Sequence, residues 1–274
     1  MTEQPPPPRI LSIAGSDSGG GAGIQADIKT IAMLGGYAMT AITAITAQNS
    51  RGVQGITPLT GDFVVEQIDS CLTDFGADAI KIGMLHDAGI IGAVAKGLAT
   101  LPEAQGVPLV LDPVMVATSG ARLLQEDAVA ILREELFPLA TLITPNLPEL
   151  EILAGRTLSD TGQIVDAAVE LAAANECHVL AKGGHTEDAR VIDILTAPGG
   201  FLMQFDDPRI DTRHTHGTGC TLSSAIATLI GHGQPLHHAV RLGRQFTRAA
   251  IENAPGFGDG HGPMGHQAVR KLSD

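Results

Sequence analysis

A short segment late in the sequence combines an anion-binding pattern with a possible proton acceptor. The segment His216-Gly-Thr-Gly-Cys220 runs directly into a helical pattern of small and apolar residues, Thr221–Ile230. The first N–H groups of a helix lack partners inside the helix, and with the positive end of the helix dipole they favour a bound phosphate. Cys220 stands at the helix start, where the pKa of a thiol tends to fall. This combination suggests phosphoryl transfer to a hydroxyl group.

A second glycine-rich segment, Gly15–Gly23, links the first expected strand to the first expected helix. A dinucleotide-binding loop has the same place in a Rossmann fold, but the GxGxxG spacing is not met, and the Lys-Ser or Lys-Thr of a P-loop is missing. The segment is therefore either a ligand-contacting loop or a flexible strand–helix turn. Asp27 lies one turn into the following helix. It is either an exposed carboxylate or a hydrogen-bond partner of a substrate.

A lysine and two glycines follow a later strand. In Lys182-Gly183-Gly184 the glycines allow a ligand to approach the backbone closely. The lysine is suited to neutralising phosphate charge. The alternative is a surface lysine beside a turn.

Side chains with oxygen atoms follow two neighbouring strands. Asp112 ends one apolar run, and Asn146 and Glu149 follow the next. Such oxygens, partly through water, suit Mg²⁺, and a nucleotide kinase needs this ion to bridge phosphates. Glu149 is equally well explained as a first-turn residue of a helix that begins near Pro148.

The histidines and cysteines form no recognisable metal site. His214 and His216 could make a metal-binding pair, but no third ligand stands at a known spacing, so a zinc site is not favoured. Cys71, Cys177 and Cys220 are odd in number and contain no CxxC pair, which argues against a disulfide framework. We interpret the first two as small core residues, and we expect the protein in the reducing cytoplasm.

Short apolar runs alternate with helical patterns, which predicts a mostly parallel sheet with helices on both faces. The expected strands are Arg9–Ser16, Ala38–Thr46, Ala79–Met84, Val107–Met115, Thr141–Thr144 and His178–Lys182. The expected helices are Gly23–Leu34, Phe63–Phe75, Asp87–Thr100, Glu126–Phe137, Leu147–Leu153, Gly162–Ala174, Thr218–Ile230 and Leu236–Asn253. Between Val191 and Arg209 two strand-like runs flank Ala197–Gly200, which predicts a hairpin. The segment Gly256–Pro263 is too rich in glycine for regular structure.

The polar candidates share one position relative to the strands. Neither a linker nor an internal repeat divides the chain, so we expect one domain over residues 9–274 after a disordered, proline-rich lead-in at 1–8. Open α/β sheets bind ligands at the carboxyl ends of their strands. The groups that follow strands are Gly15-Ser16-Asp17, Gln48-Asn49, Gly83-Met84, Asp112, Asn146 and Lys182–Gly184. We expect them to form one site.

The composition excludes several classes of protein. The chain has 274 residues, of which 44% are apolar and only 3% aromatic, so we expect a large aliphatic core. A net charge of −13, without a Lys/Arg cluster, argues against a nucleic-acid partner. We see neither a signal-peptide core nor a run of about 20 apolar residues, which argues against a membrane partner.

Several motifs, in this order, resemble the ribokinase-like superfamily, and within it the hydroxymethylpyrimidine/phosphomethylpyrimidine kinases of thiamine biosynthesis. The resemblance runs from about residue 9 to about residue 265, nearly the whole chain. The motifs are Ile13–Asp27, Thr43–Asn49, Lys81–Leu85, Leu111–Met115, Leu142–Glu149, Lys182–His185 and Thr215–Cys220. Some members of the family carry Glu where Gln48 stands, and most other ribokinase-like kinases carry Asp where Cys220 stands.

The resemblance implies a three-layer α/β/α sandwich, ATP and Mg²⁺ as cofactors, and a homodimer. It implies two ATP-dependent steps in one pocket: phosphorylation of 4-amino-5-hydroxymethyl-2-methylpyrimidine, then of its monophosphate. The implied pyrimidine pocket is Gly15, Asp27, Gln48, Met84 and Val114. The implied phosphate and metal residues are Gly217, Thr218 and Gly219 as the anion hole, Lys182 and Asn146 beside the phosphates, and Asp112 and Glu149 at the metal. Asp27 and Gln48 are expected to hydrogen-bond the aminopyrimidine edge, and Cys220 to take the hydroxyl proton.

Three other functions are compatible with parts of the sequence. A pyridoxal kinase of the same superfamily has a ring substrate that also bears a CH₂OH group. A dinucleotide-dependent dehydrogenase would use the first glycine loop but would leave the turn before Cys220 without a task. A non-catalytic nucleotide-binding regulator would keep the glycine loops and show no turnover.

Overall fold

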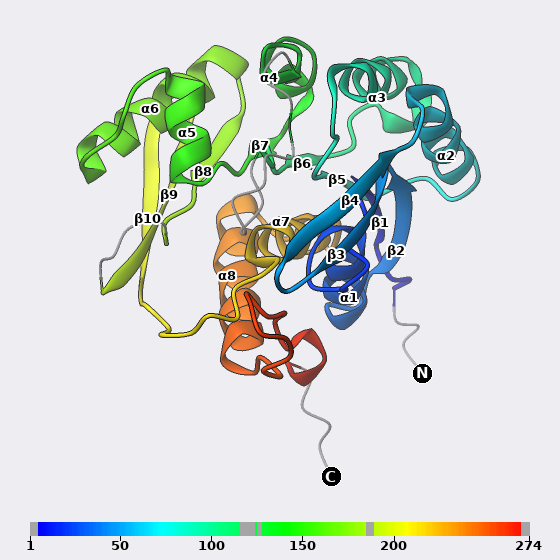
Figure 1. Ribbon diagram of the computed structural model, residues 1–274. Helices are drawn as coiled ribbons and strands as arrows, with labels where there is room; N and C mark the ends of the chain where they lie inside the picture. Colours follow the sequence, from blue (N-terminus) through cyan, green and yellow to red (C-terminus); the bar gives the residue numbers. More distant parts are fainter. Residues whose placement is uncertain (1–4, 116–123, 125–127, 185–188, 270–274) are drawn as a thin grey trace.

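An eight-stranded sheet forms the centre of the computed structural model (Figure 1), which describes residues 5–115, 124, 128–184 and 189–269. The strand order is β10-β9-β8-β7-β6-β5-β1-β2. The strands are β1 Arg9–Ala14, β2 Tyr37–Ile42, β5 Ala79–Ile82, β6 Leu109–Leu111, β7 Leu142–Ile143, β8 His178–Ala181, β9 Arg190–Ala197 and β10 Gly200–Pro208. All pairs from β2 to β8 are parallel, whereas the β8–β9 and β9–β10 pairs are antiparallel. The predicted parallel sheet and hairpin are confirmed.

Helices cover both faces of the sheet and complete the predicted α/β/α sandwich. In Figure 1, α2 to α6 lie on one face and α1, α7 and α8 on the other, and a separate apolar cluster fills each interface. The helices are α1 Gly23–Met33, α2 Gly61–Asp74, α3 Ala88–Thr100, α4 Ala128–Ile131, α5 Leu147–Ala154, α6 Thr161–Asn175, α7 Thr218–Gly231 and α8 Leu236–Glu252. Within the described ranges, none of them is both long and apolar enough to cross a membrane.

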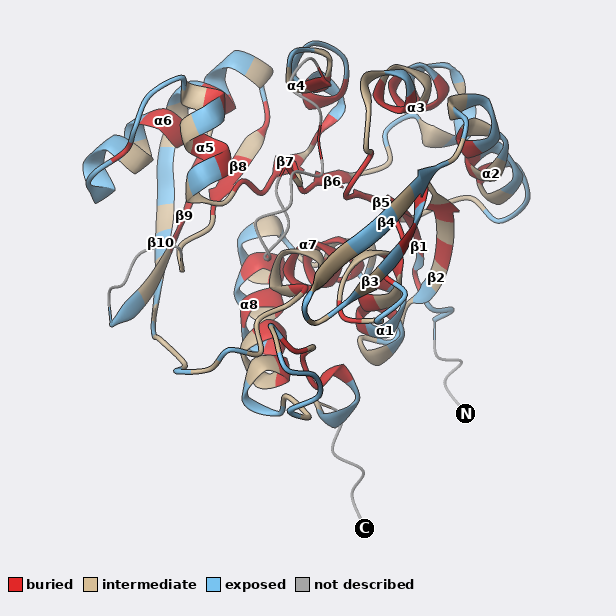
Figure 2. Ribbon diagram, in the orientation of Figure 1, coloured by how far each residue is buried: buried red, intermediate tan, exposed pale blue. Residues whose placement is uncertain are grey.

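Alternate residues of the buried strands point to opposite faces of the sheet. In β1, Leu11 and Ile13 join the apolar cluster on the α2–α6 face, while Ile10 joins the cluster on the α1, α7 and α8 face. Ser12 falls on the same face as Ile10, and its register partner in β5 is Lys81. Figure 2 shows β1 and β5 as buried. The face of the sheet toward α7 therefore carries two polar side chains, Ser12 and Lys81, on buried strands.

The strand expected over Ala38–Thr46 is in fact two strands. β2 ends at Ile42, and β3 (Ala44–Asn49) leaves the main sheet to pair antiparallel with β4 (Gly52–Pro58). Thr43 forms the bend, where its Oγ1 donates a 2.7 Å hydrogen bond to the Met84 carbonyl. β4 contains no buried residue, so its sequence lacks the apolar alternation that indicates a strand.

Two further expectations need correction. Of the helix expected over Glu126–Phe137, residues 126–127 lie outside the described chain, and the rest is the short α4, a π-helical turn (Leu132–Leu136) and a 3₁₀ turn (Phe137–Leu139). The disordered lead-in expected over residues 1–8 is wrong for Pro8. This proline is buried, and its carbonyl accepts the Tyr37 N–H at 2.8 Å, which extends the pairing of β1 and β2.

The segment Gly256–Pro263 has no regular secondary structure, as predicted, but it packs against two other loops. The Gly262 carbonyl accepts the His216 N–H at 3.3 Å, just before α7. The Gly260 N–H donates to Ser50 Oγ at 3.4 Å, at the turn between β3 and β4. The segment therefore connects the start of α7 to the β3–β4 hairpin.

A buried histidine holds the first turn of α7. His266 belongs to a 3₁₀ turn (His266–Ala268) and is 1% exposed, and its Nε2 lies 2.8 Å from Thr221 Oγ1. Burial, together with the charge of Lys29, lowers the pKa of His266 to about 4. The ring is therefore neutral in the folded protein at neutral pH.

We expect His266 to make folding less favourable as the pH falls from about 6.5, its unfolded pKa, to about 4, its folded pKa. In this window the unfolded chain binds the proton and the folded chain does not, which removes about 2 kcal/mol of stability by about pH 5. Urea unfolding at about pH 7.5 and about pH 5 measures the loss. His266→Gln should lose about 2 kcal/mol less than the wild type over this interval. Equal losses in the two proteins would contradict the assignment.

Candidate active site

A cavity of about 610 Å³ lies at the carboxyl ends of the parallel strands. It opens where the strand order reverses, because β1 has β2 on one side and β5 on the other. Ligands bind at such switch points in open α/β sheets. The cavity is lined by the predicted residues Gly15, Gln48, Met84, Asp112, Val114, Asn146, Glu149, Lys182, Gly217, Thr218, Gly219 and Cys220. Three residues expected at the site do not line it: Asp27, Asn49 and Gly83.

The N-terminal turn of α7 opens into this cavity. Its N-cap, Gly217, has a φ of 85°, and in the described chain no side chain caps the helix. The Thr218 N–H makes a long turn bond of 3.3 Å to the Thr215 carbonyl. The N–H groups of Gly219 and Cys220 have no hydrogen-bond partner among the described residues. The Gly217 N–H has no partner among the described residues either, so the donors left open include two of the three expected from the sequence, and the Cys220 N–H adds another.

Two glycines allow this turn to lie against the first glycine loop. A Cβ on Gly217 would overlap the Gly21 carbonyl oxygen, and a Cβ on Gly21 would lie 2.6 Å from His216 Cδ2. The left-handed backbone of Gly217 adds a second reason for glycine at this position. The two loops therefore fix each other's position.

Lys182 and Asp112 form a buried ion pair beside the open end of α7. Lys182 Nζ lies 2.6 Å from Asp112 Oδ1, and the lysine side chain is 11% exposed, which corrects the alternative of a surface lysine. A Cβ on Gly219 would lie 3.0 Å from Asp112 Oδ2 and 3.2 Å from Lys182 Nζ. Burial lowers the pKa of Lys182, but Asp112 and Glu149 raise it by more, so the ammonium group stays charged. An anion at the end of α7 thus meets a fixed positive charge.

Asn146 and Glu149 cap α5 as well as lining the cavity. Asn146 Oδ1 accepts the Glu149 N–H at 3.0 Å, and Glu149 Oε2 accepts the Asn146 N–H at 2.8 Å, which is a capping box. Glu149 Oε1 accepts the Met115 N–H at 3.3 Å. Burial raises the pKa of Glu149 to about 7, and the charge of Asp112 contributes to the rise. The helix role that the sequence left open for Glu149 is therefore confirmed.

The first glycine loop wraps around its own carboxylate, Asp17. The Oδ2 atom accepts the N–H groups of Gly21 at 2.9 Å and Ala22 at 2.8 Å, and Oδ1 accepts that of Gly19 at 2.8 Å. Burial raises the pKa of Asp17, but the hydrogen bond and charge of His216 and the N–H donors lower it by more, so the group is ionised. The amides that hold a pyrophosphate in a dinucleotide loop are occupied here by a side chain. This argues against the dehydrogenase alternative.

Asp27 lies beneath the cavity and not in it, which corrects both expectations for this residue. It is fully buried. Its Oδ2 accepts the Ser12 hydroxyl at 2.6 Å and pairs with Lys81 Nζ at 2.9 Å. Its Oδ1 accepts the Ser224 hydroxyl at 2.7 Å. Because both oxygens have partners inside the fold, Asp27 joins α1, β1, β5 and α7 and does not reach a bound ring.

Cys220 lines the cavity, but its thiol is not activated as the sequence predicts. Burial raises its pKa to about 11, and the charges of Asp27 and Asp112 contribute to the rise. Lys81 and the Gly23 N–H lower the pKa by less than this. The expectation of a lowered pKa is therefore wrong, because burial outweighs the effect of the helix start. The thiol form predominates at neutral pH.

The far end of the cavity is built by residues that the sequence analysis does not single out. They come from β9, α8 and the segment after β10: Val191, Asp193, Arg209, Ile210, Arg244, Thr247, Arg248 and Ile251. Asp193 connects these elements, since its Oδ1 accepts the Gly183 N–H at 2.6 Å and its Oδ2 pairs with Arg244 Nε at 2.6 Å. In the sequence, Asp193 could have been identified as a carboxylate inside an otherwise apolar strand. His185, the last residue of the lysine motif, lies outside the described chain.

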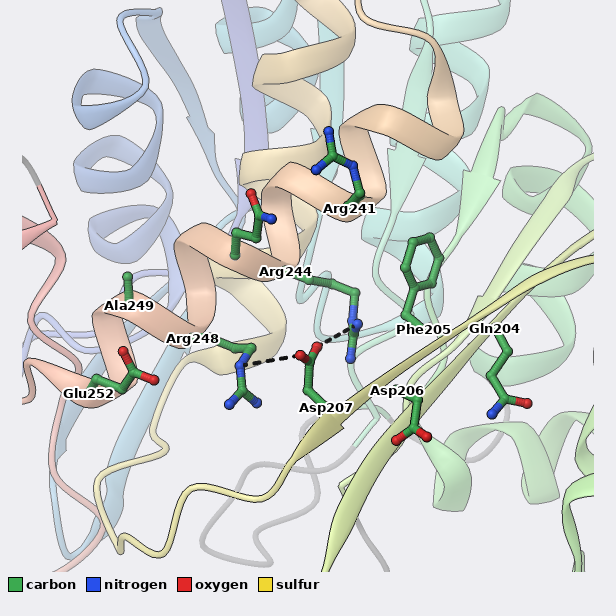
Figure 3. Close-up of a pocket in the computed structure, with 10 residues that line it drawn as sticks. Gln204, Phe205, Asp206, Asp207, Arg241, Arg244, Arg248, Ala249 and Glu252 are labelled. Carbon is green, nitrogen blue, oxygen red and sulfur yellow. Dashed lines mark ion pairs between the residues drawn. The ribbon is translucent and has the colours of Figure 1, made fainter.

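A second cavity, of about 500 Å³, lies between β10 and α8 (Figure 3). Arg244 pairs with Asp207 at 2.8 Å and lies 5.2 Å from the centre of the Phe205 ring. Arg248 approaches the same aspartate at 3.9 Å. Figure 3 shows both arginines reaching from α8 toward β10. We interpret the ion pairs around this cavity as contacts that hold the β9–β10 hairpin in place at the far end of the main cavity.

The sequence matches one described family over most of its length. The pattern of the phosphomethylpyrimidine kinase family covers residues 17–265. The chain belongs to this family. Because the members of this family are kinases, the protein is a phosphotransferase. The family also implies ATP as the phosphate donor.

Known relatives of this phosphomethylpyrimidine kinase family member match nearly the whole chain. A hydroxymethylpyrimidine/phosphomethylpyrimidine kinase from Bacillus subtilis is 46% identical over 97% of the chain and 97% of the relative. A thiamine biosynthesis bifunctional protein from Geobacter sulfurreducens is 47% identical over 94% of the chain, which spans 52% of that protein.

Solved structures show the same ribokinase-like fold. A pyridoxal kinase from Bacillus subtilis, in complex with ADP, superposes with a TM-score of 0.86 at 34% identity, covering 96% of this chain and 98% of that one. A phosphomethylpyrimidine kinase from Clostridium difficile superposes with a TM-score of 0.77 at 37% identity, covering 89% and 99%. The fold predicted from the sequence is therefore confirmed.

We expect Gly217→Ala to lower the kcat of this kinase by about 100-fold or more, because the added Cβ pushes the open turn of α7 away from Gly21. Gly233→Ala is the matched control. Gly233 also has a positive φ, of 80°, but a Cβ there would meet nothing within 4 Å. The control should lose about 1 kcal/mol of stability from backbone strain and keep its kcat. Similar losses of kcat in both variants would show that strain, and not the loop contact, is responsible.

Proposed function

We propose that the protein transfers a phosphoryl group from ATP to the hydroxymethyl group of 4-amino-5-hydroxymethyl-2-methylpyrimidine, and a second one to the resulting monophosphate. This activity belongs to thiamine diphosphate biosynthesis. The observation that carries the proposal is a single cavity onto which the open end of α7, Lys182 and Cys220 all face. The relative that is 46% identical over nearly the whole chain is named for both steps.

The acceptor pocket combines an apolar surface with one side-chain amide. The end of Met84 lies directly against Gly15, where a Cβ would overlap Met84 Cε. Val114 adds apolar surface, and Gln48 of β3 adds a group that both donates and accepts hydrogen bonds. A methylated aminopyrimidine has an apolar face and a polar edge, so it needs both kinds of contact. We assign these four residues to the ring.

The transferring phosphate is assigned to the end of α7. The N–H groups that begin the helix, with Thr218 and Gly219, cradle the phosphoryl oxygens, and Lys182 neutralises their charge. Asn146 is assigned to the other ATP phosphates, and the adenosine to the end of the cavity formed by β9 and α8. Phosphoryl transfer depends mainly on such placement and charge neutralisation.

Mg²⁺ fits beside the phosphates, with Asp112 as its protein ligand. The hydrogen bonds from Thr144 and Lys182 both fall on Asp112 Oδ1, while Oδ2 faces Gly219 at the open turn. Among the described residues, no three His, Cys, Asp or Glu side chains gather into a metal cage. An ion held mostly by phosphate and water needs no such cage. Glu149, whose oxygens both have protein partners, fits through a water molecule, and the bound ion would supply neutralising charge.

Cys220 is assigned the hydroxyl proton of the first transfer. In that step the substrate O–H bond breaks, the oxygen bonds to the γ-phosphorus, the bond to the β-phosphate oxygen breaks, and the proton passes to the thiolate. With a pKa of about 11, only a small fraction of Cys220 is thiolate at neutral pH. In the second transfer the acceptor is a phosphate oxygen with a pKa of about 6, which is already ionised. Only the first step therefore needs a base.

We propose a homodimer in a reducing cytoplasm as the working state. Cys71 and Cys177 pack in the apolar cluster on the α2–α6 face, Cys220 lines the cavity, and all three are unpaired thiols. The homodimer follows from the resemblance to the family.

We expect ATP-dependent ADP release when the protein receives either hydroxymethylpyrimidine or its monophosphate, measured with a coupled assay. Pyridoxal is the second candidate, because pyridoxal kinases are among the similar structures. It should be a weaker substrate, with a lower kcat/KM than either pyrimidine. The proposal fails if neither pyrimidine stimulates ADP release.

We expect Cys220→Ala to reduce the kcat of the first transfer by about 100-fold or more and to affect the second by less than about threefold. The wild-type kcat for the first step should rise about tenfold per pH unit from about pH 6.5 to about pH 8.5, since the thiolate pKa lies above this range. The variant should show no such rise. If Cys220→Ala keeps more than about a tenth of the first-step rate, the residue does not act as the base.

A further inference from the structure

The segment that carries Lys182 continues into two glycines, and a buried carboxylate holds the first of them. Gly184 has a φ of 92°, in the left-handed region. Two successive glycines have much conformational freedom, so they do not fix the lysine before them. The Gly183 N–H donates to Asp193 Oδ1 at 2.6 Å. The proposed function uses Lys182 at the transferring phosphate and gives Asp193 no part.

Asp193 holds Gly183 at the point where the pairing of β8 with β9 stops. The last register pair of the two strands is Ala181 with Ile194. Gly183 still lies directly against β9, because a Cβ there would overlap the Ile192 carbonyl oxygen. Its N–H bonds to the side chain of Asp193, where a backbone carbonyl would serve in a continued ladder. The carboxylate therefore extends the hold of β9 on this segment by one residue.

Lys182 is thus fixed along its backbone as well as at its ammonium group. Its N–H donates to the Pro145 carbonyl at 2.8 Å, and its Nζ pairs with Asp112 Oδ1 at 2.6 Å. The bond from Gly183 to Asp193 holds the peptide unit that follows the lysine. Without this bond the glycines are free to turn, and the ammonium group shifts relative to the phosphate that it neutralises. A small displacement of a positioned group costs a large factor in rate.

Arg244 neutralises the charge of Asp193. Asp193 is 5% exposed and Arg244 is 8% exposed, and Asp193 Oδ2 lies 2.6 Å from Arg244 Nε. A buried carboxylate without a charge partner is costly, and on the wall of this cavity it would also repel the phosphates of a nucleotide. Asp207 of β10 pairs with the same guanidinium at 2.8 Å (Figure 3). Arg244 therefore allows a carboxylate to stand beside Gly183 without an unbalanced negative charge.

We propose that Asp193 is a positioning residue for phosphoryl transfer: it holds the Gly183 N–H and so fixes Lys182 against the transferring phosphate. Arg244 is its charge partner. Because Asp193 acts through Lys182, its removal affects the transfer step more than the binding of nucleotide. This inference rests on the role proposed for Lys182 and names the residues that keep the lysine in place.

The first experiment compares two substitutions that each remove one carboxylate partner of Arg244, with ADP release in the presence of hydroxymethylpyrimidine as the assay. Asp193→Leu also removes the acceptor of the Gly183 N–H. It should lower kcat by about tenfold or more and change the KM for ATP by less than about threefold. Asp207→Leu is the matched control. It releases Arg244 from β10 but leaves the Gly183 bond in place, so its kcat should stay within about twofold of the wild-type value.

A merely structural role gives a different result. If Asp193 only forms the wall of the nucleotide site, Asp193→Leu will raise the KM for ATP and leave kcat unchanged. That result would overturn the inference, as would an equal loss of kcat in Asp207→Leu. Should Asp193→Leu fail to fold, as thermal unfolding would show, it is combined with Arg244→Met. The double variant replaces the buried pair by apolar residues, which folded proteins tolerate, and it should show the same loss of kcat.

Failure of the proposed function is distinguishable from failure of this inference. A wild type that releases ADP with pyridoxal but with neither pyrimidine would refute the proposed function. The same variants would then be compared with pyridoxal as the acceptor, and the expected loss of kcat in Asp193→Leu is the same.

A double-mutant cycle gives a second, independent measurement. Lys182→Met removes the ammonium group that Asp193 is proposed to position. In that background, adding Asp193→Leu should lower kcat by less than about twofold. Additive losses from the two substitutions would show that Asp193 does not act through Lys182, and would overturn the inference.

Discussion

The ionised carboxylate of Asp17 is the fixed point around which the site is built. It satisfies the N–H groups of the first glycine loop, so that loop stays closed without a ligand. The closed loop gives Gly217 a surface to pack on, and the first turn of α7 then opens toward Lys182 and Asp112 without a capping side chain from the described chain. One internal anion in the first loop thus leaves a second group of backbone donors available for an external one.

A second buried charge pair extends this arrangement into the sheet. Removing Lys81 and Asp27 from water is costly, and such pairs add little net stability compared with apolar residues. The requirement for geometry is strict, however, because Ser12 and Ser224 must meet the same carboxylate from β1 and α7. Few placements of α7 on the sheet satisfy all of these groups. We therefore interpret the pair as a device that positions the open end of α7.

Local sequence patterns predict what depends on spacing and fail where burial decides. Apolar runs and helical periodicity predict the sheet, and polar residues after strands predict the cavity lining, because both follow from spacing along the chain. The sequence misplaces Asp27, since no local pattern shows that Lys81 will face it from a neighbouring strand. It also misjudges the pKa of Cys220, which depends on burial and on carboxylates far away in sequence. β4 escapes prediction because it buries no side chain.

The first turn of α7 contacts segments from both ends of the chain, which the ribosome synthesises at different times. Gly21 packs against Gly217, and His266 bonds to Thr221. Synthesis proceeds at about 5–20 residues per second, so the strands up to β8 emerge well before these contacts are complete. A nascent chain that has not yet reached Gly217 and His266 lacks both the open turn of α7 and the contact that holds it. On the proposed function, we expect nucleotide turnover to begin only when translation of the domain is nearly complete.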